Sequence, residues 1–481
     1  MADTKISALP SGAPALATDE TVIARGGANY KLTGTNLLGL VTSTANTFTA
    51  TQTFGIADVT TLEASNLRAL DGTAAATIAN STGVIAVSTK VEYADGTAAA
   101  PTVTNTGDTD TGVYFPAANE VAVSAGGTVA AGFNSNGLFF RNRIINGDMR
   151  IDQRNAGAAV TTSASFVVDR FPVTNTTDGA FSAQQDSSAP TGFVNSVKFT
   201  TTTADATLTT TQNLNFTQVI EGTNVADLAW GTANALPVTL SFWVRSSLTG
   251  TFGGSLRNNG ATRSYPYSYT ISAANTWEYK TITIPGDTAG TWLTTTGIGL
   301  YVTFGLGAGP DRSGTAGAWV SANLVAPTGA VSVIGTLSAT WYITGVQLET
   351  GSVATPFERR PYTTELQLCQ RYYAKTFALG TKPADNAGSF GNLASNTGTF
   401  STGAALVGRW QFPVAMRAAP TITFYNPTTG TAGFWGDVFG TGVTYNPGSP
   451  AANEFSAAFA NASTGGTTLT PGLHVVASIE L

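Results

Sequence analysis

Cysteine and histidine are almost absent from this sequence of 481 residues, which contains only Cys369 and His474. A single cysteine excludes a disulfide within the chain. A single histidine leaves one way to build a Ser–His–Asp or Cys–His centre, and His474 has no acidic residue within three positions. The HExxH, GxSxG, Walker A and CxxC spacings are missing too. We therefore interpret His474 as a strand residue and Cys369 as a small buried apolar side chain.

Charge is also scarce. Only 11% of the residues are charged, and the 23 Lys and Arg against 29 Asp and Glu give a net charge of −6, whereas about a quarter of the residues of an ordinary soluble protein are charged. No basic run is present, so the electrostatic footprint of nucleic-acid binding is missing. Thr, Ala, Gly, Ser and Asn take the place of the charges, a composition typical of extracellular and virion β-rich proteins.

Long apolar runs are missing as well. The first twenty residues, MADTKISALPSGAPALATDE, contain no apolar core of a signal peptide. No run approaches the roughly 18 apolar residues that a membrane span requires. We expect synthesis in a cytoplasm without a signal peptide, and no membrane insertion.

The clearest boundary in the chain lies at 340–373. Aromatic and branched residues from Trp341 to Leu348 predict a half-buried strand that Gly351 ends. Thr363 or Thr364 is then the expected cap of a short helix that ends at Gly380. Four residues at helical spacing are predicted to share one face of it: Leu366, Cys369, Tyr373 and Phe377.

Residues 141–361 show short strands separated by turn clusters, the pattern of a β-sandwich. Alternation predicts an inner row in two strands, formed by Val238, Leu240, Phe242 and Val244 and by Ile298, Leu300, Val302 and Phe304. It places the intervening residues on the outside, namely Thr239, Ser241, Trp243, Arg245, Tyr301 and Thr303. Tyr265, Tyr267 and Tyr269 share one face, which we interpret as an aromatic outer face.

Residues 41–140 contain few large apolar side chains. The hexapeptide DGTAAA occurs at 71–76 and again at 95–100, and Val121, Val123 and Val129 alternate with small or polar residues. One copy of such a segment buries too little apolar surface to offset an ordering entropy of roughly 1–2 kcal/mol per residue. Either the segment is a flexible linker, or other chains complete its strands. We predict the second, an intertwined homotrimeric shaft.

Five stretches resemble, in their order, the fibre and spike proteins of tailed bacteriophages. They are RNRIINGDMRIDQRNAG at 141–157, LSFWVRSS at 240–247, VQLETGSVATPFERRP with ELQLCQRYY at 346–373, and FPVAMRAAPTITFYNP at 412–427. The resemblance implies a jelly-roll similar to carbohydrate-binding modules, followed by a small C-terminal β domain. The opening KISALPSG also resembles the end by which such fibres attach to the particle.

The expected fold is therefore mainly all-β: an elongated, multidomain, trimeric fibre. We predict a virion-attachment segment at 1–40, a thin β shaft at 41–140, a jelly-roll at 141–361, and a helix with a β-sandwich tip at 362–481. The resemblance implies a location on the virion, a tail or head protein as the partner of the N-terminus, and release of the particle by lysis.

The expected function is attachment to a host by binding its surface polysaccharide. Aromatic faces hold the C–H side of a sugar ring, and Arg side chains donate to its hydroxyls. In carbohydrate-binding jelly-rolls the ligand lies across an open sheet face. The predicted glycan-binding residues are Trp243, Arg245, Tyr267 and Tyr301. The alternative for each is that a neighbouring subunit or the C-terminal domain covers it.

Three alternatives remain open at this stage. One is a structural head or tail appendage without a receptor site. Another is a polysaccharide depolymerase, since glycoside hydrolysis needs only two carboxylates; the candidates are Asp152, Asp169, Asp205, Glu221, Asp227, Glu278, Asp311 and Glu349. We expect no catalysis and no cofactor. A structural calcium ion is the third possibility, with Asp148, Asp152 and Asp169 as its ligands.

Overall fold

The computed structural model describes residues 90–133 and 141–384, most of 388–437 and 444–481, and the backbone of five strands before residue 90. The chain divides into two compact units, Met1–Glu92 and Tyr93–Leu481. In the first unit, β1 (Glu20–Arg25) and β2 (Ala28–Thr33) form a hairpin, and β3 (Asn66–Arg68), β4 (Ala74–Ile78) and β5 (Ile85–Val87) form a sheet. The predicted attachment segment at 1–40 otherwise lies outside the described residues.

The second unit begins with an antiparallel sheet of β6 (Val103–Asn105), β7 (Asp108–Tyr114), β8 (Val121–Ala125) and β9 (Thr128–Phe133). Its register places the apolar side chains on one face, because Val103 lies opposite Val113, Val113 opposite Val123, and Val121 opposite Phe133. This valine face is open: Val103 is 41% exposed and Phe133 is 41% exposed. The buried residues Tyr114 and Ala122 belong to the other face.

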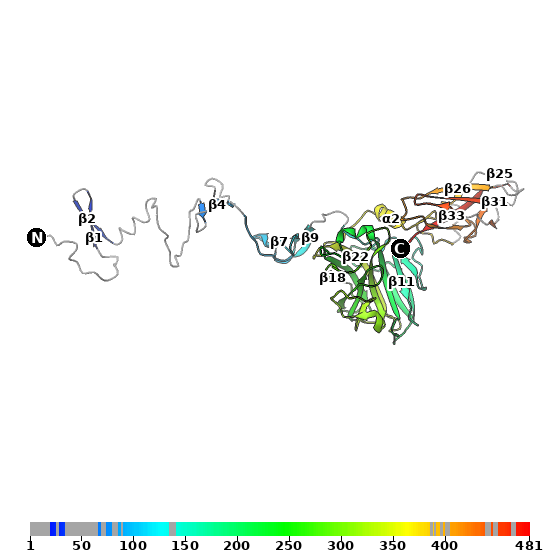
Figure 1. Ribbon diagram of the computed structural model, residues 1–481, viewed down its shortest axis with the longest axis horizontal. Coiled ribbons are helices and arrows are strands. Elements are labelled where there is room, and N and C mark those ends of the chain that lie inside the picture. Colours follow the sequence, from blue (N-terminus) through cyan, green and yellow to red (C-terminus); the bar gives the residue numbers. More distant parts are fainter. Residues whose placement is uncertain are drawn as a thin grey trace. The chain divides into compact units, whose positions relative to one another are not determined.

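A sandwich of two antiparallel sheets follows (Figure 1), with β11 in one sheet and β18 and β22 in the other. The six-stranded sheet has the order β10 (Ser165–Val168), β11 (Phe171–Asn175), β14 (Asn213–Glu221), β19 (Ile298–Ala308), β16 (Gly250–Arg257) and β17 (Ser264–Ile271). The five-stranded sheet has the order β12 (Ala180–Asp186), β13 (Ser196–Thr203), β22 (Thr340–Thr350), β15 (Val238–Ser246) and β18 (Glu278–Ile284).

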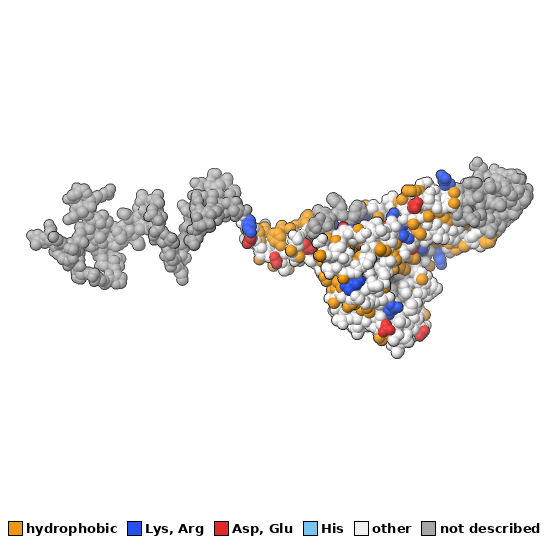
Figure 2. Space-filling view, in the orientation of Figure 1, with side chains coloured by type: hydrophobic (Ala, Val, Ile, Leu, Met, Phe, Trp, Pro, Cys, Tyr) orange, Lys and Arg blue, Asp and Glu red, His pale blue; other side chains and the backbone are white. Residues whose placement is uncertain are grey.

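Shorter elements complete the sandwich. The parallel pair β20 (Ser313–Gly314) and β21 (Ala326–Pro327) lies in the segment after β19, and the 3-10 turns are η2 (Gly222–Asn224), η3 (Ala226–Leu228) and η4 (Pro310–Arg312). The predicted all-β fold is confirmed. Figure 2 shows the surface that the composition predicts, mostly uncharged polar groups and backbone with isolated charges.

Alternation predicts the core well. Val238, Leu240, Phe242 and Val244 of β15 are fully buried, as are Leu300, Val302 and Phe304 of β19. They pack with β22, whose Trp341 ring lies 5.9 Å from the Phe304 ring and 6.0 Å from that of Phe199. This interlocked aromatic core positions both sheets.

The predicted outer position of the three tyrosines of β17 is wrong. Tyr265, Tyr267 and Tyr269 face the core and are 6%, 1% and 6% exposed. The Tyr267 hydroxyl donates to the carbonyl of Thr303 at 2.8 Å. Gly254 of β16 makes room for the ring, because a Cβ there would lie 2.5 Å from the hydroxyl. Alternation alone does not say which face of a strand points inward.

The C-terminal region opens with helix α2 (Tyr362–Gln370) and continues in short strands. These are β23 (Tyr373–Lys375), β24 (Leu393–Ala394), β25 (Gly398–Thr399), β26 (Ala405–Gln411), β27 (Thr421–Tyr425), β28 (Trp435–Asp437), β29 (Thr444–Tyr445), β30 (Ala451–Ala452), β31 (Ser456–Ala462), β32 (Thr468–Leu469) and β33 (Pro471–Ser478). No helix of the described residues is long and apolar enough to cross a membrane.

The predicted helix is too long and its cap is wrong. Helix α2 starts after Pro361, so Thr363 and Thr364 lie inside it, and it ends at Gln370. Tyr373 instead begins β23 and pairs with Ser478 of β33. Tertiary strand pairing has overridden the helical spacing that continues to Phe377.

Cys369 is fully buried and His474 lies in a strand, as predicted, and His474 is fully buried as well. His474 lies in β33, where its ring stacks on Phe377 at 4.1 Å and its Nδ1 lies 3.0 Å from the Thr376 hydroxyl. Burial lowers the pKa of His474 and raises that of the Cys369 thiol. Both side chains are packed inside the fold.

Replacing Leu348 by alanine tests the packing of the central strand. Leu348 is fully buried, and a leucine removed from such a site costs about 2–5 kcal/mol of unfolding free energy. Leu337 is 62% exposed, so L337A is a matched control that should change stability by less than about 0.5 kcal/mol. Urea unfolding followed by fluorescence measures both. Equal losses in the two variants would contradict this description of the core.

Candidate functional site

The structure does not bring the four predicted glycan-binding residues together. Trp243 and Arg245 lie on the outer face of the five-stranded sheet. Tyr301 lies on the outer face of the other sheet, and Tyr267 is in the core between the two. The predicted outer position of Tyr267 is therefore wrong, and of the other three residues only Trp243 and Arg245 are neighbours.

Beside Trp243, two cations and the tyrosine ring between them form a row across three strands of the five-stranded sheet. The register sets Arg245 of β15 opposite Tyr342 of β22, and Tyr342 opposite Lys198 of β13. The Arg245 guanidinium lies 4.9 Å from the Tyr342 ring centre, and the Lys198 ammonium lies 5.7 Å from it. Trp277 packs on the same ring at 6.1 Å. Both cations are within range of the attraction between a positive charge and a ring face.

A second aromatic pair lies one step along the strands. Trp243 is opposite Tyr279 of the edge strand β18, and the ring centres are 5.4 Å apart. Trp243 is half-buried, whereas Tyr279 is 43% exposed. Cross-strand pairing of this kind holds two aromatic rings in fixed orientation.

A β-bulge in β22 extends the aromatic surface. The pairing of β15 with β22 shifts between Ser241 and Trp243, and Gly345 in the bulge has a φ of +63°. The ring of Phe193, from the loop between β12 and β13, lies over this glycine, because a Cβ there would be 2.7 Å from it. A side chain at position 345 would therefore displace the ring and adopt a backbone conformation that favours glycine.

Phe193 links the bulge to the segment after β22. Its ring lies 5.2 Å from that of Phe357, and the Arg359 guanidinium lies 4.7 Å from the Phe193 ring centre. We call this continuous surface the aromatic face; its residues are Phe193, Lys198, Trp243, Arg245, Trp277, Tyr279, Tyr342, Phe357 and Arg359.

The cations of the aromatic face differ from most others in the sandwich. Among the described residues, Lys198, Arg245 and Arg359 form no ion pair, and the Arg245 Nη1 donates only to the Ser188 hydroxyl, at 3.0 Å. Their donors are therefore not neutralised by the protein. Ring faces combined with unneutralised donors suit a ligand with a C–H surface and oxygen acceptors.

Part of this surface was within reach of sequence reasoning. Tyr342 follows from alternation along 340–350, once Trp341 is assigned to the core. Tyr279 follows from the pairing of β18 with β15. Phe193, Phe357 and Arg359 come from loops and have no periodic signal.

The eight carboxylates considered for hydrolysis lie mostly in structural bonds. Glu221 accepts from the Arg371 guanidinium and the Tyr372 hydroxyl, each at 2.7 Å. Glu349 accepts from the Thr355 hydroxyl at 2.6 Å, and burial raises its pKa. Asp227 and Glu278 pair with cations, Asp152, Asp169 and Asp205 accept from backbone amides, and Asp311 is exposed.

The three aspartates considered for calcium also have protein partners. Asp148 pairs with Arg150, Asp152 accepts from the amides of Asn155 and Gly157, and Asp169 accepts from the Gln153 amide. Burial raises the pKa of Asp169 to about 6. Within the described part of the chain, no three acidic, His or Cys side chains form a group that could hold a metal ion.

No protein-family model matches the chain, and no curated protein matches it. Among solved structures it is similar to the enzymatically active domain of tailspike protein 4 of bacteriophage CBA120, with 14% identity and a TM-score of 0.24, covering 44% of this chain and 22% of that one. It is also similar to a putative sugar-binding protein from Bacteroides thetaiotaomicron, with 11% identity and a TM-score of 0.25 over 44% of this chain and 100% of that one. A third is the family 11 carbohydrate-binding module of a Clostridium thermocellum cellulase, with 12% identity and a TM-score of 0.20 over 41% and 98%. Similarities of this size assign the chain to no family.

Replacing Gly345 by alanine tests the bulge. The new Cβ meets the Phe193 ring, so we expect a loss of about 1–3 kcal/mol and a weaker near-ultraviolet circular dichroism signal. Gly329 is a matched control, because it also has a positive φ, +78°, and nothing lies within 4 Å of its Cβ position. G329A should show only the backbone cost, about 1 kcal/mol. Indistinguishable effects would show that Phe193 does not pack on the bulge.

Proposed function

We propose that the chain is a homotrimeric virion appendage that attaches a phage to its host by binding surface polysaccharide through the aromatic face. The observation that carries the proposal is the set of rings around the half-buried Trp243 and the buried Tyr342, with three cations that no carboxylate of the described residues neutralises. Rings and unneutralised donors on one outer sheet face are what a saccharide chain requires. The proposal assigns binding, and no catalysis, to this face.

The open valine face of β6–β9 supports the homotrimer. It presents Val103, Val121 and Phe133 to solvent, although Phe133 is one of only two aromatic side chains in the four strands of the sheet. A fully exposed side chain of this kind gains about 1.5–3 kcal/mol on burial, and these three, which are 37–41% exposed, would gain a corresponding part of it. Further copies of the same chain present the same face and can bury it, and the resemblance to phage fibres implies three copies.

With three copies of the aromatic face, each single site needs only a low affinity for the polysaccharide. Once one site holds a polysaccharide, the others bind at a high effective concentration, so avidity exceeds the affinity of a single site by orders of magnitude. The resemblance of the chain to phage fibres is the support for the virion as its location. A tail or head protein is the proposed partner of the N-terminal segment.

Replacing Trp243 or Tyr279 by alanine tests the glycan proposal. On an array of bacterial surface polysaccharides, the full chain should bind at least one, and each substitution should weaken binding about tenfold or more, because a stacking ring is lost. F455A is the control, since Phe455 is 57% exposed and lies in the C-terminal region. Unchanged binding by folded W243A and Y279A would refute the proposal for this face. Release of reducing sugar from the bound polysaccharide would instead favour a depolymerase.

Replacing Val103 by aspartate tests the assembly. Sedimentation velocity of the full chain should give three times the mass of one chain, and V103D should shift it toward the monomer, because a charge then enters an apolar interface. V194D is the matched control, since Val194 is 69% exposed on a loop outside the β6–β9 sheet. A wild-type chain that sediments as a folded monomer would contradict the trimer.

A further inference from the structure

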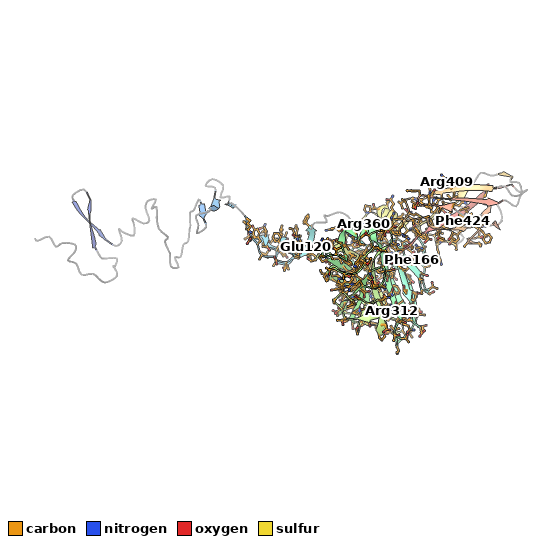
Figure 3. All side chains as sticks on the ribbon, viewed as in Figure 1. Glu120, Phe166, Arg312, Arg360, Arg409 and Phe424 are labelled. Carbon is orange, nitrogen blue, oxygen red and sulfur yellow. The ribbon has the colours of Figure 1, made fainter. Side chains whose placement is uncertain are left out.

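Two further arginines that form no ion pair with a described residue lie on the other side of the sandwich. Arg257 projects from β16 onto the outer face of the six-stranded sheet, and Arg312, labelled in Figure 3, closes η4 in the segment after β19. Asn323 joins them, because its side-chain oxygen accepts from Arg257 Nη1 at 2.7 Å and its carbonyl from Arg312 Nη1 at 3.5 Å. Neither arginine forms an ion pair with a carboxylate of the described residues.

The positive charge of Arg257 has few hydrogen bonds and no described carboxylate to balance it. Its Nε is buried without a hydrogen-bond partner, and its Nη2 has only a long contact of 3.5 Å to the Thr303 hydroxyl. Burial, together with the nearby charge of Arg312, lowers the pKa of Arg257 to about 10. A guanidinium withdrawn from water is normally paired with an acid, because leaving it alone is costly.

The surroundings of Arg257 are one aromatic ring and several buried hydroxyls. Tyr301 of β19 lies directly opposite it, and the guanidinium is 5.0 Å from the half-buried ring. Thr303 continues the row, bonded at 3.2 Å to the hydroxyl of Thr217 on β14. Ser255, on the same side of β16, has a buried hydroxyl without a partner. The half-buried Tyr301 ring thus lies beside a positive charge that lacks its acid, and the hydroxyls of Ser255 and Thr303 are buried.

We propose that Arg257, Arg312 and Tyr301 form a second carbohydrate site, which binds the carboxylate of an acidic sugar. The carboxylate takes the place of the missing counter-ion, since a guanidinium holds two carboxylate oxygens in parallel hydrogen bonds. The sugar ring rests against Tyr301, and Asn323 supplies an amide to its hydroxyls. This site is independent of the aromatic face, because it lies on the opposite sheet of the sandwich.

Saturation-transfer NMR of the full chain with D-glucuronate tests the site, with D-glucose and acetate as the two partial ligands. We expect glucuronate to bind at least about tenfold more tightly than either, because only it offers both a ring and an acid. R257Q and Y301L should each lose about tenfold or more. R409Q is the control, since Arg409 is exposed on β26 in the C-terminal region.

The outcomes separate the two proposed sites. Glucuronate binding that R257Q and Y301L abolish and W243A preserves supports the second site, whatever the aromatic face binds. Equal binding of glucose and glucuronate, or acetate as strong as glucuronate, overturns it, as does loss in W243A alone. Should R257Q fail to fold, R257K keeps the charge without the planar fork, and undiminished binding by folded R257K and Y301L overturns the proposal equally.

Discussion

The burial of one face of β22 is the constraint on which the rest of this structure depends. This strand lies in the middle of the five-stranded sheet, and Trp341, Ile343, Val346 and Leu348 are completely buried against the opposite sheet. A slip of one residue would turn all of them away from the opposite sheet, so the register is strongly specified. Tyr342 is therefore held on the outer face between Lys198 and Arg245.

The few charges of the chain are used in two distinct ways. Where the sandwich meets the C-terminal region, charges are paired and buried: Glu221 of β14 takes two donors from Arg371 and one from Tyr372, and Arg154 and Arg170 both pair with Glu480. On the outer faces of the two sheets, Lys198, Arg245 and Arg257 form no ion pair with any carboxylate that the structure describes. Removing one partner of a buried pair is costly, whereas the binding proposals rest on the cations of the outer faces.

Sequence patterns were informative where one strand carried the whole signal. The inner rows of β15 and β19 and the strand at 340–350 follow from the sequence pattern. The open valine face agrees with the small number of large apolar residues in 41–140. The patterns failed where a distant segment decided the outcome. Tyr267 faces inward because Gly254 of the neighbouring strand makes room for it, and Tyr373 leaves the helix to pair with β33. Phe193 and Arg359 reach the aromatic face from loops, whose course no local pattern specifies.

The most direct test of the central claim is a crystal structure of the chain with an oligosaccharide from a polysaccharide that it binds. Our account predicts a sugar ring stacked on Trp243 or Tyr279, with hydroxyl or acidic oxygens within hydrogen-bond distance of Arg245 or Arg359. An oligosaccharide bound only to the C-terminal strands, with the aromatic face covered by a neighbouring subunit, would contradict it.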